Sequence, residues 1–274
     1  MKETAVSHVI EKEVLVVVKT YPTPSGKHIE TVCTAGISKS GEWTRLYPVK
    51  FRYLSDDKRY TLFTWIRVRL IKNKIDQRPE SYKIFDENIE VLRHLDSTKG
   101  LEERKRWLLP LMRKSMEEIE QEYKSDSRSL AIFKPKQIVK FHVDPEARDW
   151  TDAEKAKLGQ ISLFDDPSTL PTVLKKVPYS FRCEYICDDP NCKGHKQKIT
   201  SWDFNWAYFQ YCTRYGDESV ALKHLEAKWL SYFSPEKDGY LIVGTTHPYD
   251  SFIIIGVFSV AKGNSCFMEP LTFE

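Results

Sequence analysis

Three cysteines and a histidine within 13 consecutive positions are the feature that most restricts how this 274-residue chain can fold. The segment FRCEYICDDPNCKGHKQ carries Cys183, Cys187, Cys192 and His195. Zinc in proteins prefers four thiolate or imidazole ligands in a tetrahedron, and short loops that turn back on themselves can deliver them. The DDPN sequence supplies a turn, and Gly194 allows a bend before the histidine. The spacing therefore predicts a Zn²⁺ site, with a closed structural arrangement favoured over a catalytic one.

Cys183 also has a second interpretation. In YSFRCEYI it falls on the same strand face as Phe181 and Tyr185, and a buried cysteine in a strand is an ordinary core residue. If Cys183 lies in the core, the fourth ligand position is either open, as catalytic zinc requires, or filled from a distance by Cys212 or another histidine. The sequence leaves these alternatives open.

The remaining sequence favours an intracellular protein. The first 13 residues, MKETAVSHVIEKE, mix charges of both signs and lack the apolar core of a signal peptide. No apolar run approaches the roughly 18 residues of a membrane span. We therefore expect a cytoplasmic protein that does not enter membranes, in which clustered cysteines bind metal rather than form disulfides.

Residues 1–100 are predicted to form an antiparallel, β-rich basic domain. The segments VLVVVKTYP, HIETVCTAGIS, EWTRLYPV and TLFTWIRVRLI are rich in β-branched and aromatic residues and are separated by turn sequences. Short strands so close together indicate a barrel or a strongly bent sheet. In the last segment, apolar residues alternate with Trp65, Arg67 and Arg69, so one face is apolar and the other is basic.

Helices are predicted over residues 101–165, and an α/β part with the Cys/His knuckle over 166–274. Pro110 should kink or restart the first helix, and Thr151 with Glu154 forms a capping box at another. Ser201 and Asp217 are expected to cap two later helices, followed by two buried strands. The overall prediction is a mixed α+β fold, whose three segments could also form one continuous domain.

Positive charge is concentrated although the net charge is only +3. Ten basic residues but only three acidic ones lie between Arg45 and Arg78, a pattern that favours an anionic partner, most commonly nucleic acid. Arginines hold phosphates and aromatic rings stack on bases. The predicted nucleic-acid-binding residues are Arg45, Arg52, Trp65, Arg67, Arg69, Lys72, Lys74 and Arg78. A solvated basic sheet face would give the same pattern.

Two carboxylates are candidates for hydrolytic chemistry. Asp203 lies beside Trp202 and Trp206, as an acid would in a pocket for a flipped base. Glu80 follows a proline in the loop after the basic strand, and loops on rigid sheets often carry function. A first-turn acid among core aromatics explains the first pattern equally well, and a solvated loop explains the second.

Together these features predict a zinc-containing, DNA-acting protein that binds DNA, including modified DNA, through a basic and aromatic β surface. Hydrolysis is left open, with a glycosylase favoured over a nuclease. The alternative is a non-enzymatic protein–protein adaptor with a purely structural zinc site. Salt-dependent DNA binding would separate the first prediction from the second.

Overall fold

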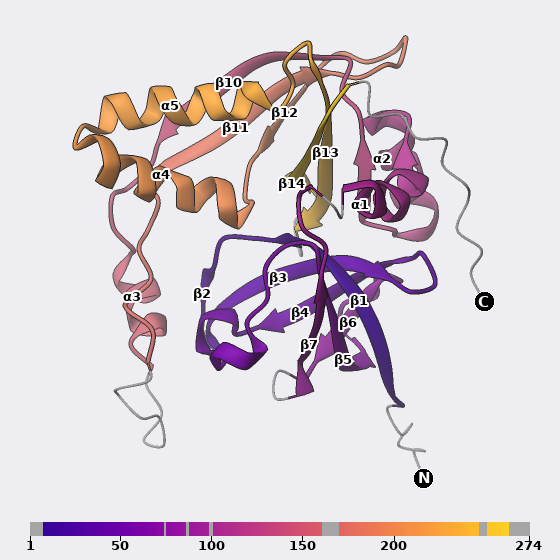
Figure 1. Cartoon of the computed structure of the whole chain (residues 1–274). Helices are drawn as coiled ribbons and strands as arrows, with labels where there is room; N and C mark the ends of the chain where they lie inside the picture. Colours follow the sequence, from indigo (N-terminus) through magenta and orange to yellow (C-terminus); the bar gives the residue numbers. More distant parts are fainter. Residues whose placement is uncertain are drawn as a thin grey trace.

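The N-terminal part of the computed structural model is a closed five-stranded barrel, which confirms the predicted barrel-like, β-rich part (Figure 1). The structure describes residues 8–73, 75–85, 88–98, 101–160, 170–246 and 251–262. The barrel strands are β1 (Val9–Lys19), β3 (Ile29–Ser38), β4 (Trp43–Val49), β5 (Thr64–Lys72) and β6 (Ser81–Ile84). They follow the order β1-β3-β4-β6-β5, and β5 pairs again with β1. The β4–β6 pair is parallel and the others are antiparallel.

Short elements complete the barrel. They are β2 (Thr23–Ser25) beside β3, β7 (Glu90–His94) beside β5, and the 3₁₀ helices η1 (Phe51–Tyr53) and η2 (Asp56–Lys58). The interior is apolar and includes Ile66, Val68 and Leu70, the three residues that the alternation in β5 predicts to share a face.

β1 closes the barrel because it pairs along both of its edges. β1 pairs with β5 from Val9 to Val16 and with β3 from Val14 to Lys19. A bulge between Val16 and Val18 bends the strand at the end of its pairing with β5. At Gly36 on β3, a Cβ atom would lie only 2.3 Å from the carbonyl oxygen of Leu15. Glycine is therefore required at this close approach, and substitution there would push the two strands apart.

The C-terminal part consists of two sheets with helices packed on them. One sheet has the order β14-β13-β9-β8 and the other β10-β11-β12. Its strands are β8 (Met112–Arg113), β9 (Leu130–Phe133), β10 (Gln137–Pro145), β11 (Tyr179–Ile186), β12 (His195–Lys198), β13 (Lys237–Thr246) and β14 (Ser251–Ala261). Its helices are α2 (Met116–Asp126), α3 (Asp152–Leu158), α4 (Trp202–Tyr215) and α5 (Glu218–Ser231), and α1 (Leu101–Leu108) with η4 (Leu109–Leu111) leads into it.

Local helix signals are confirmed. Pro110 lies in η4, which separates α1 from α2. Thr151 and Glu154 form both hydrogen bonds of the predicted capping box, and Ser201 and Asp217 cap α4 and α5. The predicted helical middle differs from expectation because it also contains β8, β9 and β10. The β9 run LAIF pairs with the far later β13, a partner that local sequence does not reveal.

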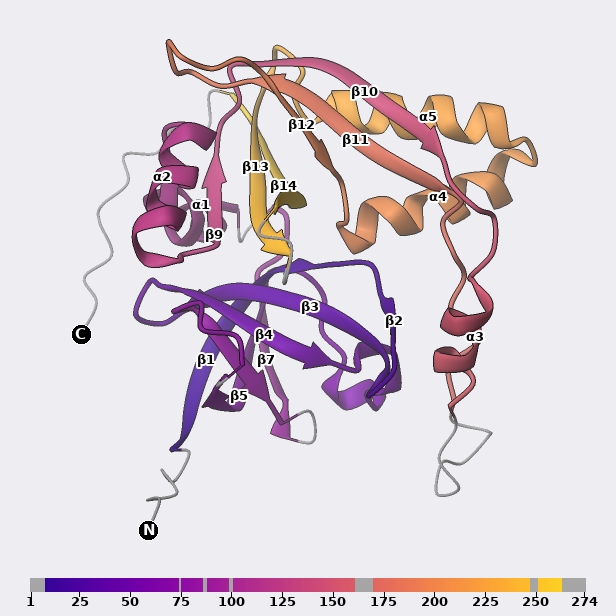
Figure 2. The same ribbon diagram turned by 180° about the vertical axis from the view of Figure 1, so that it is seen from behind.

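The barrel packs against the four-stranded sheet, as the two opposite views in Figures 1 and 2 show. Leu15 and Ile37 of the barrel lie in one buried apolar cluster with Ile132 of β9 and Ile242 of β13. A second apolar cluster lies between α4, α5 and the paired strands β10 and β11 and includes Phe181 and Trp229. Within the described part, none of the helices is long and apolar enough to span a membrane.

Candidate metal centre, buried charges and a surface groove

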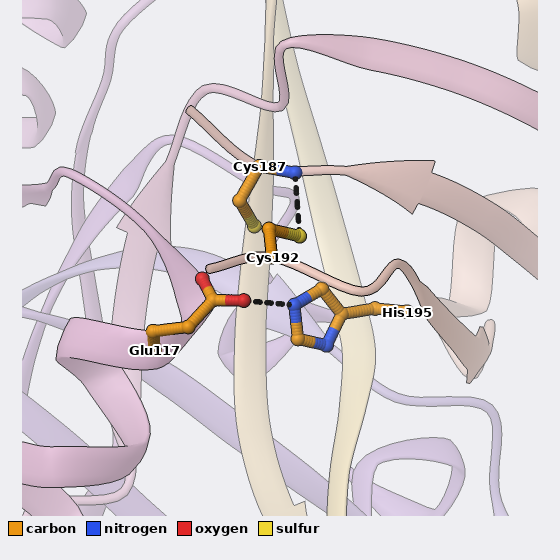
Figure 3. A group of neighbouring side chains, drawn as sticks. All are labelled: Glu117, Cys187, Cys192 and His195. Carbon is orange, nitrogen blue, oxygen red and sulfur yellow. Dashed lines mark hydrogen bonds and ion pairs between the residues drawn. The ribbon is translucent and has the colours of Figure 1, made fainter. Parts of the chain in front are cut away.

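Glu117, Cys187, Cys192 and His195 form the metal group, whose potential ligand atoms all lie within 4.8 Å of one another (Figure 3). Glu117 lies in the first turn of α2, Cys187 and Cys192 lie on the loop that joins β11 to β12, and His195 is the first residue of β12. The Nε2 atom of His195 is 2.9 Å from Oε1 of Glu117. Two sulfurs, one imidazole nitrogen and one carboxylate oxygen in this space could hold a metal ion.

The loop delivers its ligands as the local sequence predicts. The Asp189 carboxylate accepts a hydrogen bond from the amide of Asn191 at 2.8 Å, and its carbonyl accepts one from the amide of Cys192 at 3.1 Å, which forms a tight turn. Gly194 has a φ of +89°, a left-handed conformation that favours glycine and redirects the chain into β12. Stacking on Tyr185, with ring centroids 5.3 Å apart, orients the His195 imidazole.

In the described part of the chain, few hydrogen bonds are donated to the side chains of the metal group. Backbone amides of Met116 and Cys187 donate to the sulfurs of Cys187 and Cys192 at 3.3 and 3.2 Å. Burial, together with the nearby charge of the Glu117 carboxylate, raises the pKa of the Cys187 thiol to about 12. One oxygen of Glu117, Oε2, is buried and has no hydrogen-bond partner among the residues that the structure describes. A divalent cation would satisfy this oxygen and stabilise the thiolates, so the residues present fit a metal.

Cys183 lies outside the metal group. It is fully buried in the apolar cluster beneath α4 and α5, and burial raises the pKa of its thiol to about 12. The position that the sequence assigned to Cys183 or left open is occupied by Glu117, from a helix some 70 residues earlier. Sequence reasoning missed Glu117 because an acid in the first turn of a helix is ordinary.

The predicted nucleic-acid-binding residues do not form one surface. Trp65 is only 2% exposed, with Trp107 against its ring and Lys39 over it, so it cannot stack on a base. Arg45 is 3% exposed, and Arg78 donates to Thr245 of β13. Lys74 lies outside the described residues.

The other four predicted residues keep some exposure. Arg67 forms ion pairs with Glu13 and Glu90 at 2.8 and 2.7 Å, and these acids offset its charge. Arg69 and Lys72 are exposed. Arg52 contacts the Thr172 carbonyl and pairs with Glu30 at 3.2 Å. Most of these cations therefore serve the barrel itself or its contacts.

Charged and polar residues between the barrel and the four-stranded sheet form a hydrogen-bonded group, which we call the seam cluster. Its members are Arg45, Asp76, Arg78, Glu80, Ser129 and Thr245. Arg78 holds Asp76 through two hydrogen bonds of 2.8 and 2.6 Å. Burial raises the pKa of Asp76, but the hydrogen bonds from Arg78 and Ser81 outweigh it and hold that pKa well below its usual range.

Glu80, one predicted catalytic carboxylate, belongs to the seam cluster. It is 6% exposed and accepts hydrogen bonds from the amide of Ser129, at 3.0 Å, and from the Ser129 hydroxyl. Arg45 donates to the same hydroxyl at 2.8 Å. This geometry ties the start of β9 to the barrel, and it leaves Glu80 away from any exposed surface.

Asp203, the other predicted catalytic carboxylate, is exposed in the first turn of α4. Its negative charge acts on the buried Lys19, whose ammonium lies 4.0 Å from the ring centroid of Phe51 and 5.4 Å from that of Trp202. Burial lowers the pKa of Lys19 to about 8, whereas Asp203 raises it. The two predicted carboxylates therefore lie in different clusters and do not form a catalytic pair.

A groove lies at the meeting point of three segments: the loop after β1, residues 172–176 before β11, and α4. It consists of two adjoining hollows, of about 140 and 670 Å³, that share Val173, Leu174 and Lys175. Tyr21, Trp202 and Trp206 line the smaller hollow. Among the described residues that line the two hollows, five are cationic and one, Asp149, is a carboxylate; the cations are Arg52, Arg148, Lys155, Lys175 and Lys176.

More positive charge lies on the adjacent barrel surface. The charges of Lys27, Lys50 and Lys83 each lower the pKa of His28, adding to the effect of its burial. These lysines come from the first barrel connection, the end of β4 and β6. The barrel therefore carries a local positive patch that the sequence did not predict, because its three lysines are far apart in the chain.

The chain belongs to the family described as "Domain of unknown function (DUF8757)", whose model matches residues 112–271. Residues 10–110 match the model described as "Domain of unknown function (DUF8758)". None of the curated proteins matches the chain. The two matches meet at η4. The metal group thus lies wholly within the second match, whereas the seam cluster has members in both.

Proposed function

We propose that this protein binds nucleic acid through the cationic groove and holds a structural Zn²⁺ ion in the metal group. The groove lining carries five cations, of which Arg52, Arg148 and Lys155 pair with Glu30, Glu218 and Asp149. The positive charge that Lys175 and Lys176 add to the lining is the observation that carries the functional proposal. Lys175 and Lys176 form no ion pair with a carboxylate within 4.0 Å in the described part of the chain, which leaves their charge to attract phosphates. DNA is the ligand to test first.

The topology of the barrel is consistent with this proposal. With β2 and β7 set aside, its strands follow the order 1-2-3-5-4-1, and the third and fifth are parallel. This is the strand order of the oligonucleotide/oligosaccharide-binding fold, which binds its ligands on the second and third strands and the loop after the first. Here the loop after the first strand contributes Tyr21 and Pro22 to the groove. A fold does not determine function, so the topology adds less support than the charges.

Zinc is the metal that the donor set favours. Two thiolates and an imidazole suit Zn²⁺, and four protein ligands make a closed site of the structural kind. When bound, the ion would cross-link α2 to the β11–β12 loop. The cytoplasmic location predicted from the sequence would keep both thiols reduced.

DNA hydrolysis remains a prediction, and Asp203 is the carboxylate to test. It follows Trp202, which lines the smaller hollow. An Asp203→Asn variant should lose any base excision or strand cleavage while it still binds DNA. Breaks that appear only after alkali would indicate a glycosylase, and breaks without alkali would indicate a nuclease.

Salt-dependent binding tests the proposal. Labelled DNA should bind the zinc-loaded protein, and if four or five phosphates are contacted, affinity should fall on the order of a hundredfold between about 50 and 200 mM salt. A Lys175→Ala/Lys176→Ala variant should show a smaller salt slope. Lys39→Ala, which removes an exposed lysine stacked on Trp65, is the matched control and should leave the slope unchanged. No binding at low salt would contradict the proposal and favour the protein–protein adaptor.

A further inference from the structure

Several aromatic rings line the groove beside its cations, and the attraction of an anionic ligand alone would not need them. Tyr21 lies with its ring centroid 6.2 Å from that of Trp202 and 6.3 Å from that of Phe209. The Trp206 ring lies 5.7 Å from Phe209. Trp202 and Trp206 line the smaller hollow and Phe209 lines the larger one, so the rings run from one hollow into the next.

These rings are held in place and remain partly accessible. The Tyr21 hydroxyl donates to the carbonyl of Lys175 at 2.8 Å, which links the barrel connection to the opposite wall of the groove. The indole of Trp150 is fixed similarly, by a 2.7 Å hydrogen bond to the carbonyl of Leu174. Trp206 is 43% exposed, unusual for so large an apolar ring. Fixed rings lose little conformational entropy when a flat ligand stacks on them.

Cations alternate with the rings. The ammonium of Lys175 lies 5.8 Å from the Phe209 centroid, and that of Lys176 lies 5.6 Å from the Trp150 centroid. A ligand that stacks on the rings would therefore place its anionic groups beside these lysines. Flat bases linked by phosphates have this alternation.

We infer that the ligand of the groove is single-stranded nucleic acid, with bases stacked on the rings around Trp206 and phosphates beside Lys175 and Lys176. This inference rests on the proposed function. In a duplex the base faces are covered by their neighbours, so a recessed ring can reach them only in an unpaired strand. Stacking tolerates any base, so sequence preference should be weak.

The test compares a labelled single-stranded oligonucleotide with the duplex of the same sequence, using the zinc-loaded full chain. The single strand should bind at least about tenfold more tightly, because each stacked base contributes roughly a factor of ten. Trp206→Ala should weaken single-strand binding by about tenfold and leave duplex binding unchanged, whereas Trp206→Phe should retain most of the affinity.

Tyr215→Ala is the matched control, since Tyr215 is an exposed ring at the far end of α4, stacked on His224 at 4.1 Å. It should leave both affinities unchanged. Equal affinity for both ligands, or no response to Trp206→Ala, would overturn the single-strand inference while nucleic-acid binding itself stands. Failure of both ligands to bind at low salt would instead overturn the proposed function.

Discussion

The seam cluster and the metal group both gather ionisable side chains inside the fold, but they differ in which side chains they bring together. In the seam cluster, Arg78 is matched by Asp76, and Arg45 and Glu80 meet at the Ser129 hydroxyl. The metal group instead gathers a carboxylate, two thiols and an imidazole, with no arginine or lysine among its members. The arginines and carboxylates of the seam cluster offset one another's charge, whereas the metal group could hold a cation from outside. We therefore expect the seam cluster to hold the barrel against the four-stranded sheet, and the metal group to act as a ligand site.

Removing a metal ligand should have the largest effect. Cys192→Ser should abolish zinc binding and lower the free energy of unfolding on the order of 5 kcal/mol, because a structural ion contributes directly to folding. Zinc content and denaturant unfolding would measure both. Cys183→Ala is the control: it should keep the ion and cost only about 1–2 kcal/mol for the cavity it leaves. A Cys183 variant that lost zinc would contradict the comparison.

Breaking the seam cluster should cost somewhat less and leave the metal in place. Arg78→Ala leaves Asp76 buried without its partner, which should lower the free energy of unfolding by about 3–5 kcal/mol. Arg67→Ala removes an arginine from an exposed network with Glu13 and Glu90, and should lower the free energy of unfolding much less than Arg78→Ala does. Equal losses in the two variants would show that the seam does not depend on this pair.

The paired surface carboxylate of Glu218 should contribute least to the free energy of unfolding, and its contribution should depend on pH. Hydrogen bonds from Arg148 and Tyr208 lower the pKa of Glu218 to about 2. The paired carboxylate should therefore contribute in full above about pH 4.5, its ordinary pKa, and lose its effect as the pH falls towards 2. Wild type and Glu218→Gln should differ in unfolding free energy by less than about 1 kcal/mol at pH 7 and converge as the pH falls to about 2. A gap that widens in acid would contradict this sign.

Local sequence patterns predicted those features whose causes are local. The turn that brings Cys187, Cys192 and His195 together, the caps at Thr151, Ser201 and Asp217, and the apolar face of β5 depend on residues a few positions apart. A capping box or an alternating strand specifies its own geometry, so no distant partner is needed to recognise it.

Features set by distant packing could not be predicted in the same way. Alternation shows that Trp65 and Arg67 share a face of β5, but not that Trp107 covers one and acidic side chains surround the other. The same limit hid Glu117, since a first-turn acid becomes a candidate ligand only when the β11–β12 loop packs beside it. The groove cations also come from separate segments and form no pattern in the sequence.

X-ray absorption at the zinc edge of the purified, zinc-loaded protein would test most directly the claim that the metal group takes its cation through Glu117. We expect one zinc per chain with two sulfur neighbours at about 2.3 Å and two nitrogen or oxygen neighbours at about 2.0–2.1 Å. Glu117→Gln should weaken that binding without changing the sulfur count. Three sulfur neighbours would place Cys183 in the site instead of Glu117, and a protein that takes up no zinc would contradict the metal centre altogether.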